Sequence, residues 1–250
     1  MALAATGFDQ AKVLIDRGIQ SDGAQPSGTA YLVSTSDTAR NVRAAYYPDI
    51  AARMANWIDS EIVYAEGIQD RTDVLFYFTG KARVPHLETV EFVPGAIADH
   101  LTSAGGRLTD SRQMSALRWL EAGATGSYGT VVEPCNVPGK FPHPGVLMEA
   151  YGAGRTLLEA YWQSVQQPGE GIFVGDPLAA PYDAYRLQRD GDRLRLTTRV
   201  LQPGRYRLFY ATDPVGPFHA APHLLEVGYH QQHFELPDIE TANYLRLERL

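Results

Sequence analysis

The sequence contains one cysteine, Cys135, among 250 residues. A single cysteine cannot form a disulfide within the chain, which excludes a small secreted scaffold held by disulfides and leaves the compartment open. No apolar run approaches the length of a membrane span, so no transmembrane helix is expected. The first ten residues, MALAATGFDQ, have neither a basic region nor a sufficient apolar core for a signal peptide, and export would need a different segment.

Clustered positive charge is also missing. The chain has 22 Lys and Arg against 29 Asp and Glu, which gives a net charge of -7. Nucleic-acid binding depends on clustered Lys and Arg, so no nucleic-acid partner is expected. A hydrophobic content of 44% and a charged content of 20% are typical of a globular protein and argue against a disordered or fibrous chain.

Short apolar runs alternate with amphipathic segments as far as residue 182, which is the pattern of an α/β sheet domain. The predicted strands are Thr29–Val33, Glu61–Ala65, Val74–Phe78 and Thr89–Val93, the last ended by Pro94-Gly95. The predicted helices are Gln10–Arg17, one from Ser36 or Asp37 to Tyr47, Asp49–Ser60 and Ser111–Ala122.

The stretch from Gly123 to Tyr182 is predicted to organise this domain. It reads as a strand, a turn-rich loop, one amphipathic helix and a second strand, Ile172–Val174, all within a parallel sheet. Because such sheets bind ligands at the carboxyl ends of their strands, the polar residues after each strand are the first candidates for a site.

The periodicity changes from helical to two-residue alternation after Tyr185. About five short strands follow, as in a small antiparallel β-sandwich, which is usually a binding or packing module. The sequence therefore predicts two domains, residues 1–182 and 183–250.

Several motifs in the first domain resemble a known family. FVPGAIADHLTSAGG, GSYGTVVEPCNVPGKFPHP, EAYWQSV and GIFVGDPLAAPY are similar to an uncharacterised bacterial family whose members tend to occur in species that carry the exosortase protein-sorting system. The resemblance covers about Gly18 to Tyr182. It implies an envelope or exported setting and a mostly parallel three-layer α/β sheet. Family members carry more α/β sequence ahead of this start, which leaves open a native protein that extends upstream of Met1.

In overall plan that family resembles the caspase-like cysteine peptidases, gingipain-type enzymes in particular. Those enzymes place a catalytic His-Gly after one central strand and a catalytic Cys after the next. Here the strand VLFYF is followed by Thr79-Gly80, and TVEFV is followed by Pro94-Gly95. The resemblance therefore carries over a fold and no peptidase dyad.

Cys135 is the first candidate for catalysis. A thiolate needs a base within hydrogen-bond reach, and His143 lies eight residues further on in a loop rich in Pro and Gly, where Glu133 could orient it. The alternative is that Cys135 is only a small buried apolar residue.

Asp99 and His100 form the second candidate, because they follow a predicted strand and would lie at the carboxyl edge, with Thr102 and Ser103 as further binding residues. An acid beside an imidazole suggests a general base or a metal site. The alternative gives Asp99 a capping role and His100 a structural hydrogen bond, since adjacent residues point in different directions. No HxH or HExxH spacing supports a metal site, and no cofactor is expected.

Two polar residues of the organising stretch complete the set. Ser127 lies in GATGSYG, which lacks the spacing of a nucleophile elbow, and the glycines around it indicate close packing of backbones. Asp176 lies in a Gly-Asp-Pro turn. It has either a structural role, with hydrogen bonds to backbone N–H groups of that turn, or a role in binding a ligand at the same sheet edge.

Three readings of the function remain. The first is a non-enzymatic or degenerate caspase-like domain that recognises a protein or peptide in envelope or protein-sorting biology. The second is a cysteine hydrolase that uses Cys135 with His143 or His100. A third reading places a glycan or protein binding site on the second domain.

Overall fold

The computed structural model describes residues 3, 5–134, 136–182, 185–190, 193–198, 201, 203–229, 233–237 and 243–250. The chain packs as two compact units, Met1–Tyr182 and Asp183–Leu250.

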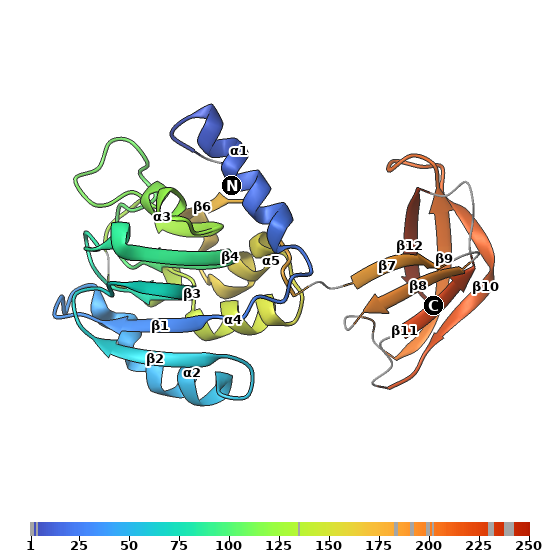
Figure 1. Cartoon of the computed structure of the whole chain (residues 1–250), viewed down its shortest axis with the longest axis horizontal. Coiled ribbons are helices and arrows are strands. Elements are labelled where there is room, and N and C mark those ends of the chain that lie inside the picture. Colours follow the sequence, from blue (N-terminus) through green and yellow to red (C-terminus); the bar gives the residue numbers. More distant parts are fainter. Residues whose placement is uncertain are drawn as a thin grey trace. The chain divides into compact units, whose positions relative to one another are not determined.

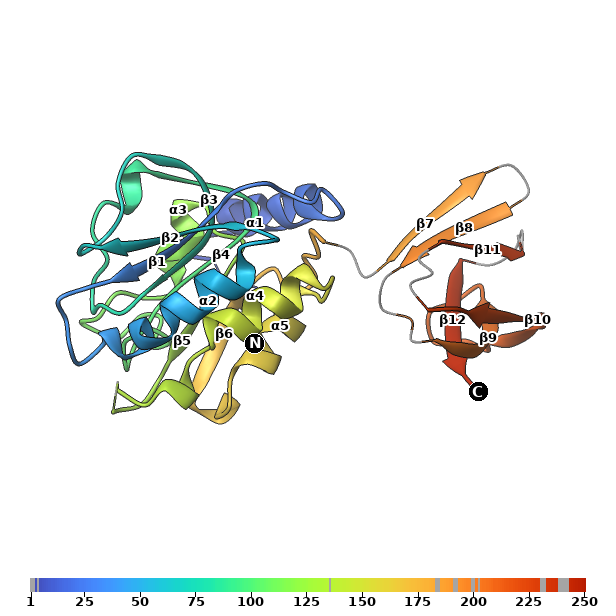
Figure 2. The same ribbon diagram turned by 90° about the horizontal axis from the view of Figure 1, so that it is seen from below.

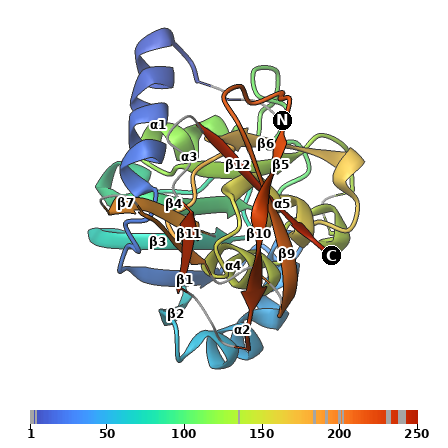
Figure 3. The same ribbon diagram turned by 90° about the vertical axis from the view of Figure 1, so that its right-hand side faces the viewer.

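The first unit is built on a six-stranded sheet of order β2-β1-β3-β4-β5-β6 (Figure 1). Every neighbouring pair is parallel except β5 and β6. Figure 3 shows the same order from the side, with β2 lowest and β5 and β6 uppermost. The strands are β1 (Thr29–Ser34), β2 (Asp59–Tyr64), β3 (Arg71–Thr79), β4 (Val90–His100), β5 (Gly126–Thr130) and β6 (Gly171–Gly175). The predicted α/β class is confirmed.

Helices cover both faces of the sheet (Figure 2). One face carries α2 (Tyr47–Met54), α4 (Pro144–Gly152) and α5 (Leu157–Ser164), and the other carries α1 (Phe8–Ser21) and α3 (Leu117–Ala122). Short 3₁₀ helices span Asn41–Tyr46, Leu87–Thr89, Pro138–Lys140 and Pro168–Glu170. Because both faces are covered, central strands such as β3 are apolar on both sides.

Strand β4 does not stop at Pro94-Gly95, and that prediction is wrong. Val74 of β3 pairs with Phe92, whereas Phe76 pairs with Ile97, so β4 bulges between the two pairs. The bulge accommodates Pro94, which has no N–H to donate, and Gly95, whose φ is +90°. The strand then continues to His100.

The organising stretch also departs from the prediction. Its loop leads into two helices, α4 and α5, separated by a turn at Gly154, whose φ is +86°. Strand β6 runs antiparallel to β5, so the parallel arrangement predicted for it is wrong. The carboxyl end of β6 therefore lies at the opposite edge from that of β5.

The predicted helix Ser111–Ala122 begins only at Leu117, as α3. Backbone N–H groups ahead of it bond to other segments: Met114 donates to the carbonyl of Ala82, and Ala116 donates to that of Gly105. Tertiary contacts thus replace the first turns of the predicted helix.

The second unit contains two antiparallel sheets, of order β10-β9-β12 and β11-β8-β7. Their strands are β7 (Tyr185–Asp190), β8 (Arg193–Thr198), β9 (Gly204–Ala211), β10 (His219–Val227), β11 (His233–Pro237) and β12 (Tyr244–Arg249). Side chains from both sheets share one apolar cluster that includes Leu196, Leu208 and Phe234. The predicted antiparallel strands are confirmed where the structure describes them.

Gly129 tests the close packing of backbones in β5. A Cβ atom at this position would lie 2.3 Å from the backbone nitrogen of Gly106. We expect Gly129→Ala to lower the free energy of unfolding by about 2 kcal/mol, because backbone cannot move aside as a flexible side chain can. Urea denaturation followed by tryptophan fluorescence measures this, since all three tryptophans lie in the first unit.

Gly169→Ala is the matched control, because a Cβ there has no heavy atom within 4 Å. Its effect should stay within about 0.5 kcal/mol. Equal effects of the two substitutions would contradict the packing role of Gly129.

Candidate functional site

Loops from three strands meet at the carboxyl edge of the sheet. Arg40 lies in the loop after β1, Thr102 and Ser103 follow β4, and Glu133 follows β5. Gln113, from the segment ahead of α3, lies between them. The structure thus brings together three of the residues predicted from the sequence and adds Arg40 and Gln113.

These five side chains form one directional chain of hydrogen bonds. Arg40 Nε–H donates to Thr102 Oγ1 at 2.9 Å, and the Thr102 hydroxyl donates to Gln113 Oε1 at 2.7 Å. Gln113 Nε2 donates to Ser103 Oγ at 2.9 Å, and the Ser103 hydroxyl donates to Glu133 Oε1. The chain therefore runs from a guanidinium donor to a carboxylate acceptor, and each bond polarises the next.

The middle of the chain is fixed and its ends are accessible. The Ala104 backbone N–H donates to Gln113 Oε1 at 2.7 Å, which sets the orientation of the amide. Thr102 and Ser103 are buried. At one end Arg40 pairs with Asp37 at 3.0 Å, with side chains 23% and 24% exposed, and at the other end Glu133 is exposed.

Asp99 lies below this chain and is fully buried. Arg43 Nη2 donates to Asp99 Oδ1 at 2.5 Å and to the carbonyl of Thr79 at 3.0 Å, while Nη1 donates to the carbonyl of Pro142 at 3.0 Å. Burial raises the pKa of the Asp99 carboxyl group, and the Arg43 guanidinium opposes that rise. The contacts of Arg43 thus tie Thr79, Asp99 and Pro142 together inside the unit.

His100 points to the other face of the sheet. Its Nδ1 accepts from Trp119 Nε1–H at 2.9 Å, and its Nε2 lies 3.0 Å from the carbonyl of Met114. Because Nδ1 accepts, Nε2 carries the proton and donates. Burial lowers the pKa of His100 to about 4. Both ring nitrogens are therefore engaged, and Asp99 and His100 diverge as expected for neighbours on a strand.

His143 immediately precedes α4 on the face opposite His100. Its Nδ1 accepts from the Val146 backbone N–H at 3.4 Å, and its ring lies 5.1 Å from that of Tyr46. Burial lowers its pKa. His143 and Arg43 line a cavity of about 90 Å³. The two candidate histidines thus lie on different faces of the sheet.

Cys135 lies outside the described residues. The segment before it is held by Lys140, whose Nζ donates to the carbonyls of Val132 at 2.7 Å and Pro134 at 3.3 Å. Lys140 is 3% exposed and lies 3.5 Å from a carboxylate oxygen of Glu170. A buried ammonium thus anchors the loop that carries Glu133.

Ser127 and Asp176 lie away from the hydrogen-bond chain that runs from Arg40 to Glu133. Ser127 is buried within β5. The Asp176 backbone N–H donates to the carbonyl of Thr125, and Asp176 Oδ1 accepts from the Leu178 N–H, both at 3.0 Å. The expectation that Asp176 shares the edge with the other candidates is wrong, because β6 is antiparallel and ends beside the start of β5.

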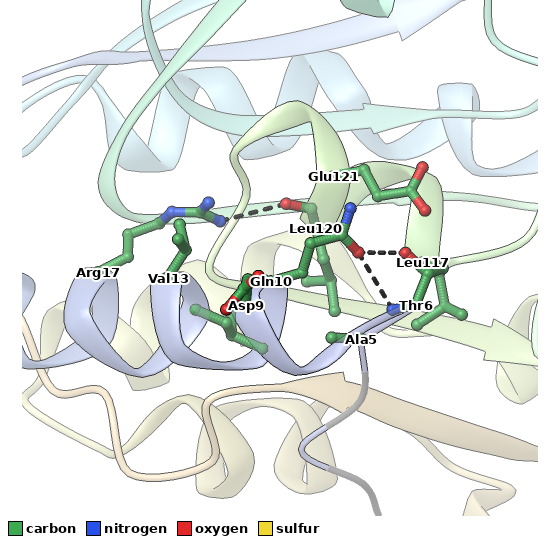
Figure 4. A pocket seen from close by; sticks show the side chains of 10 residues that line it. Ala5, Thr6, Asp9, Gln10, Val13, Arg17, Leu117, Leu120 and Glu121 are labelled. Atoms are coloured by element: carbon green, nitrogen blue, oxygen red, sulfur yellow. Dashed lines mark hydrogen bonds between the residues drawn. The ribbon is translucent and has the colours of Figure 1, made fainter.

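A hollow of about 180 Å³ lies between α1 and α3 (Figure 4). Its wall includes Val13, Leu117 and Leu120, and Arg17 closes one end by donating to the carbonyls of Leu120 and Ala124. Ala124 lies two residues before β5, so this hollow lies at the amino end of that strand and is separate from the carboxyl edge.

No described helix has the length and apolar character needed to span a bilayer. Within the described ranges, no three His, Cys, Asp or Glu side chains converge on a point where a metal ion could bind. The chain matches no protein family, no curated protein and no solved structure.

Sequence reasoning missed Arg40, Arg43 and Gln113. Arg40 and Arg43 lie in the predicted helix from Ser36 or Asp37 to Tyr47, and Gln113 lies inside the predicted helix Ser111–Ala122. The one signal in the sequence was the polar run STSDTARN directly after the apolar run of β1, which marks it as a loop at the carboxyl edge.

The Arg43–Asp99 pair tests how the carboxyl edge is held. Arg43→Met leaves a buried carboxylate without its partner, so we expect a loss of about 3–5 kcal/mol in the free energy of unfolding. The double variant Arg43→Met/Asp99→Leu should recover much of this loss, because it removes the stranded charge. Urea denaturation of the three proteins measures both effects.

Arg53→Met is the matched control, because Arg53 pairs with Glu149 at the surface, with side chains 46% and 43% exposed. Its cost should be at most about 1 kcal/mol. A double variant no more stable than Arg43→Met alone would contradict the account.

His100 makes the first unit less stable as the pH falls. Its pKa is about 4 in the folded chain against 6.5 for the ordinary group, so the unfolded chain takes up the proton first. This loss begins below about pH 6.5 and reaches about 3 kcal/mol near pH 4. His100→Gln keeps an acceptor and a donor, and we expect it to remove this part of the pH dependence in urea denaturation.

His86→Asn is the control, because His86 is exposed and its φ of +62° is one that Asn tolerates. This variant should follow the wild-type pH profile. A His100→Gln profile equal to that of the wild type would count against a buried neutral imidazole.

Proposed function

We propose that the first unit is a recognition domain that binds a protein or peptide ligand at the carboxyl edge of its sheet without cleaving it. The observation that carries the proposal is the directional chain from Arg40 to Glu133. It fixes polar side chains from several loops in one place and leaves its charged ends accessible. Preorganised polar groups of this kind bind with little loss of side-chain entropy.

The groups below the edge favour binding over catalysis. Both ring nitrogens of His100 make hydrogen bonds, and Asp99 pairs with Arg43. After β3, where a caspase-like enzyme carries its His-Gly, this sequence has Thr79-Gly80. His100 and Asp99 thus help to hold the edge together.

The family context is part of the proposal. The motifs from Gly18 to Tyr182 resemble the exosortase-associated family, and a mostly parallel sheet with helices on both faces is compatible with a caspase-like plan. We infer a degenerate caspase-like domain that works in protein sorting or at the bacterial envelope. Its ligand is then a segment of another protein.

Glu133 is the residue on which to test this function. Random peptides displayed on phage would be selected on the wild-type chain, and their affinities measured by fluorescence anisotropy. We expect Glu133→Gln to weaken the selected peptides about tenfold, because a hydrogen bond to a charged group is worth about 1.5–3 kcal/mol.

Glu91→Gln is the matched control, since Glu91 is an exposed residue near the start of β4, at the other end of the strand. Its affinities should equal those of the wild type. Equal losses in both variants, or no enriched peptide, would contradict the proposal. Cleavage of selected peptides by the wild type but not by Cys135→Ala would favour the hydrolase instead.

A further inference from the structure

A cleft of about 530 Å³ opens beside the hydrogen-bond chain in the first unit. Its walls come from the connection between β3 and β4 and from the segment that leads into α3. Gln113 lines the cleft and is also a member of the hydrogen-bond chain, so the two features are continuous.

The rim of the cleft is rich in arginine. Arg83, Arg107 and Arg118 line it from three parts of the chain, and Glu88 is the one acid among its described lining residues. The lining itself therefore presents three guanidinium groups against one carboxylate. Guanidinium donors favour an anionic ligand over a cationic one.

The arginines keep donors for a ligand. Arg107 pairs with Asp110 and Arg118 with Glu121, in pairs at least partly exposed that contribute little to stability. Neither acid lines the cleft. Each guanidinium has five N–H donors, more than these described contacts use.

The lower part of the cleft is apolar. Val84 and Met114, each 7% exposed, line it together with Leu87 and Leu108. A bare inorganic anion would leave these side chains unused. A peptide with acidic and apolar residues would satisfy both the rim and the floor.

We propose that this cleft binds an acidic segment of a partner protein, with carboxylates on the arginine rim and apolar side chains on the floor. This inference rests on the proposed function, since it names the chemistry of a ligand that approaches the same edge. An extended segment with alternating Glu and Leu presents the two kinds of side chain on opposite sides.

A fluorescein-labelled peptide of alternating Glu and Leu tests the proposal, with a Lys and Leu peptide as its counterpart. By fluorescence anisotropy the acidic peptide should bind the full chain at least tenfold more tightly than the basic one. Arg107→Gln and Arg118→Gln should each weaken it several-fold, and added salt should weaken it further because ions screen exposed charges.

Arg155→Gln is the matched control, because it removes the same charge from an exposed position between α4 and α5. It should leave the affinity unchanged. Equal binding of both peptides, no binding of either, or an equal loss with Arg155→Gln would overturn the assignment. If the acidic peptide failed but Glu133→Gln still weakened the phage-selected peptides, the proposed function would stand without the acidic ligand. If Glu133→Gln had no effect either, both proposals would fail.

Discussion

The buried guanidinium of Arg43 is the contact on which the carboxyl edge depends. It bonds to the end of β3 at the Thr79 carbonyl, to β4 at Asp99, and to the Pro142 carbonyl just ahead of α4. A charge buried in an apolar core is costly unless hydrogen bonds and an opposite charge compensate it. Because Arg43 is compensated from three segments, it holds those segments in one relative position.

Two consecutive residues of β4, Asp99 and His100, fix the end of this strand from both faces of the sheet. Asp99 faces the layer of α2 and α4, where Arg43 lies, while His100 faces α3 and bonds to Trp119 and Met114. The end of β4 is thus fixed from both sides. Thr102 and Ser103 come just after Leu101, so their hydroxyls are presented to Arg40, Gln113 and Glu133 from beside a fixed strand end.

Charged and neutral groups of the hydrogen-bond chain are divided between surface and interior. The neutral members of the chain are buried or half-buried, and its ionised ends, Arg40 and Glu133, reach solvent. Beside them, three arginines line the cleft between β3 and α3. Charges at the rim of a binding surface set specificity and association rate more than affinity.

The sequence by itself determined the α/β class, the antiparallel strands after residue 185, and the presence of Thr102, Ser103 and Glu133 after strands, because hydrophobic periodicity and turn residues are local signals. The tertiary structure alone decided the rest. Strand β4 runs through Pro94-Gly95 because β3 tolerates a bulge there, and Asp176 lies at the far edge because β6 is antiparallel. Arg43 holds the carboxyl edge through Asp99, 56 residues further along the sequence, and Gln113 bonds to Thr102, 11 residues before it. Such contacts leave no periodic pattern in a sequence.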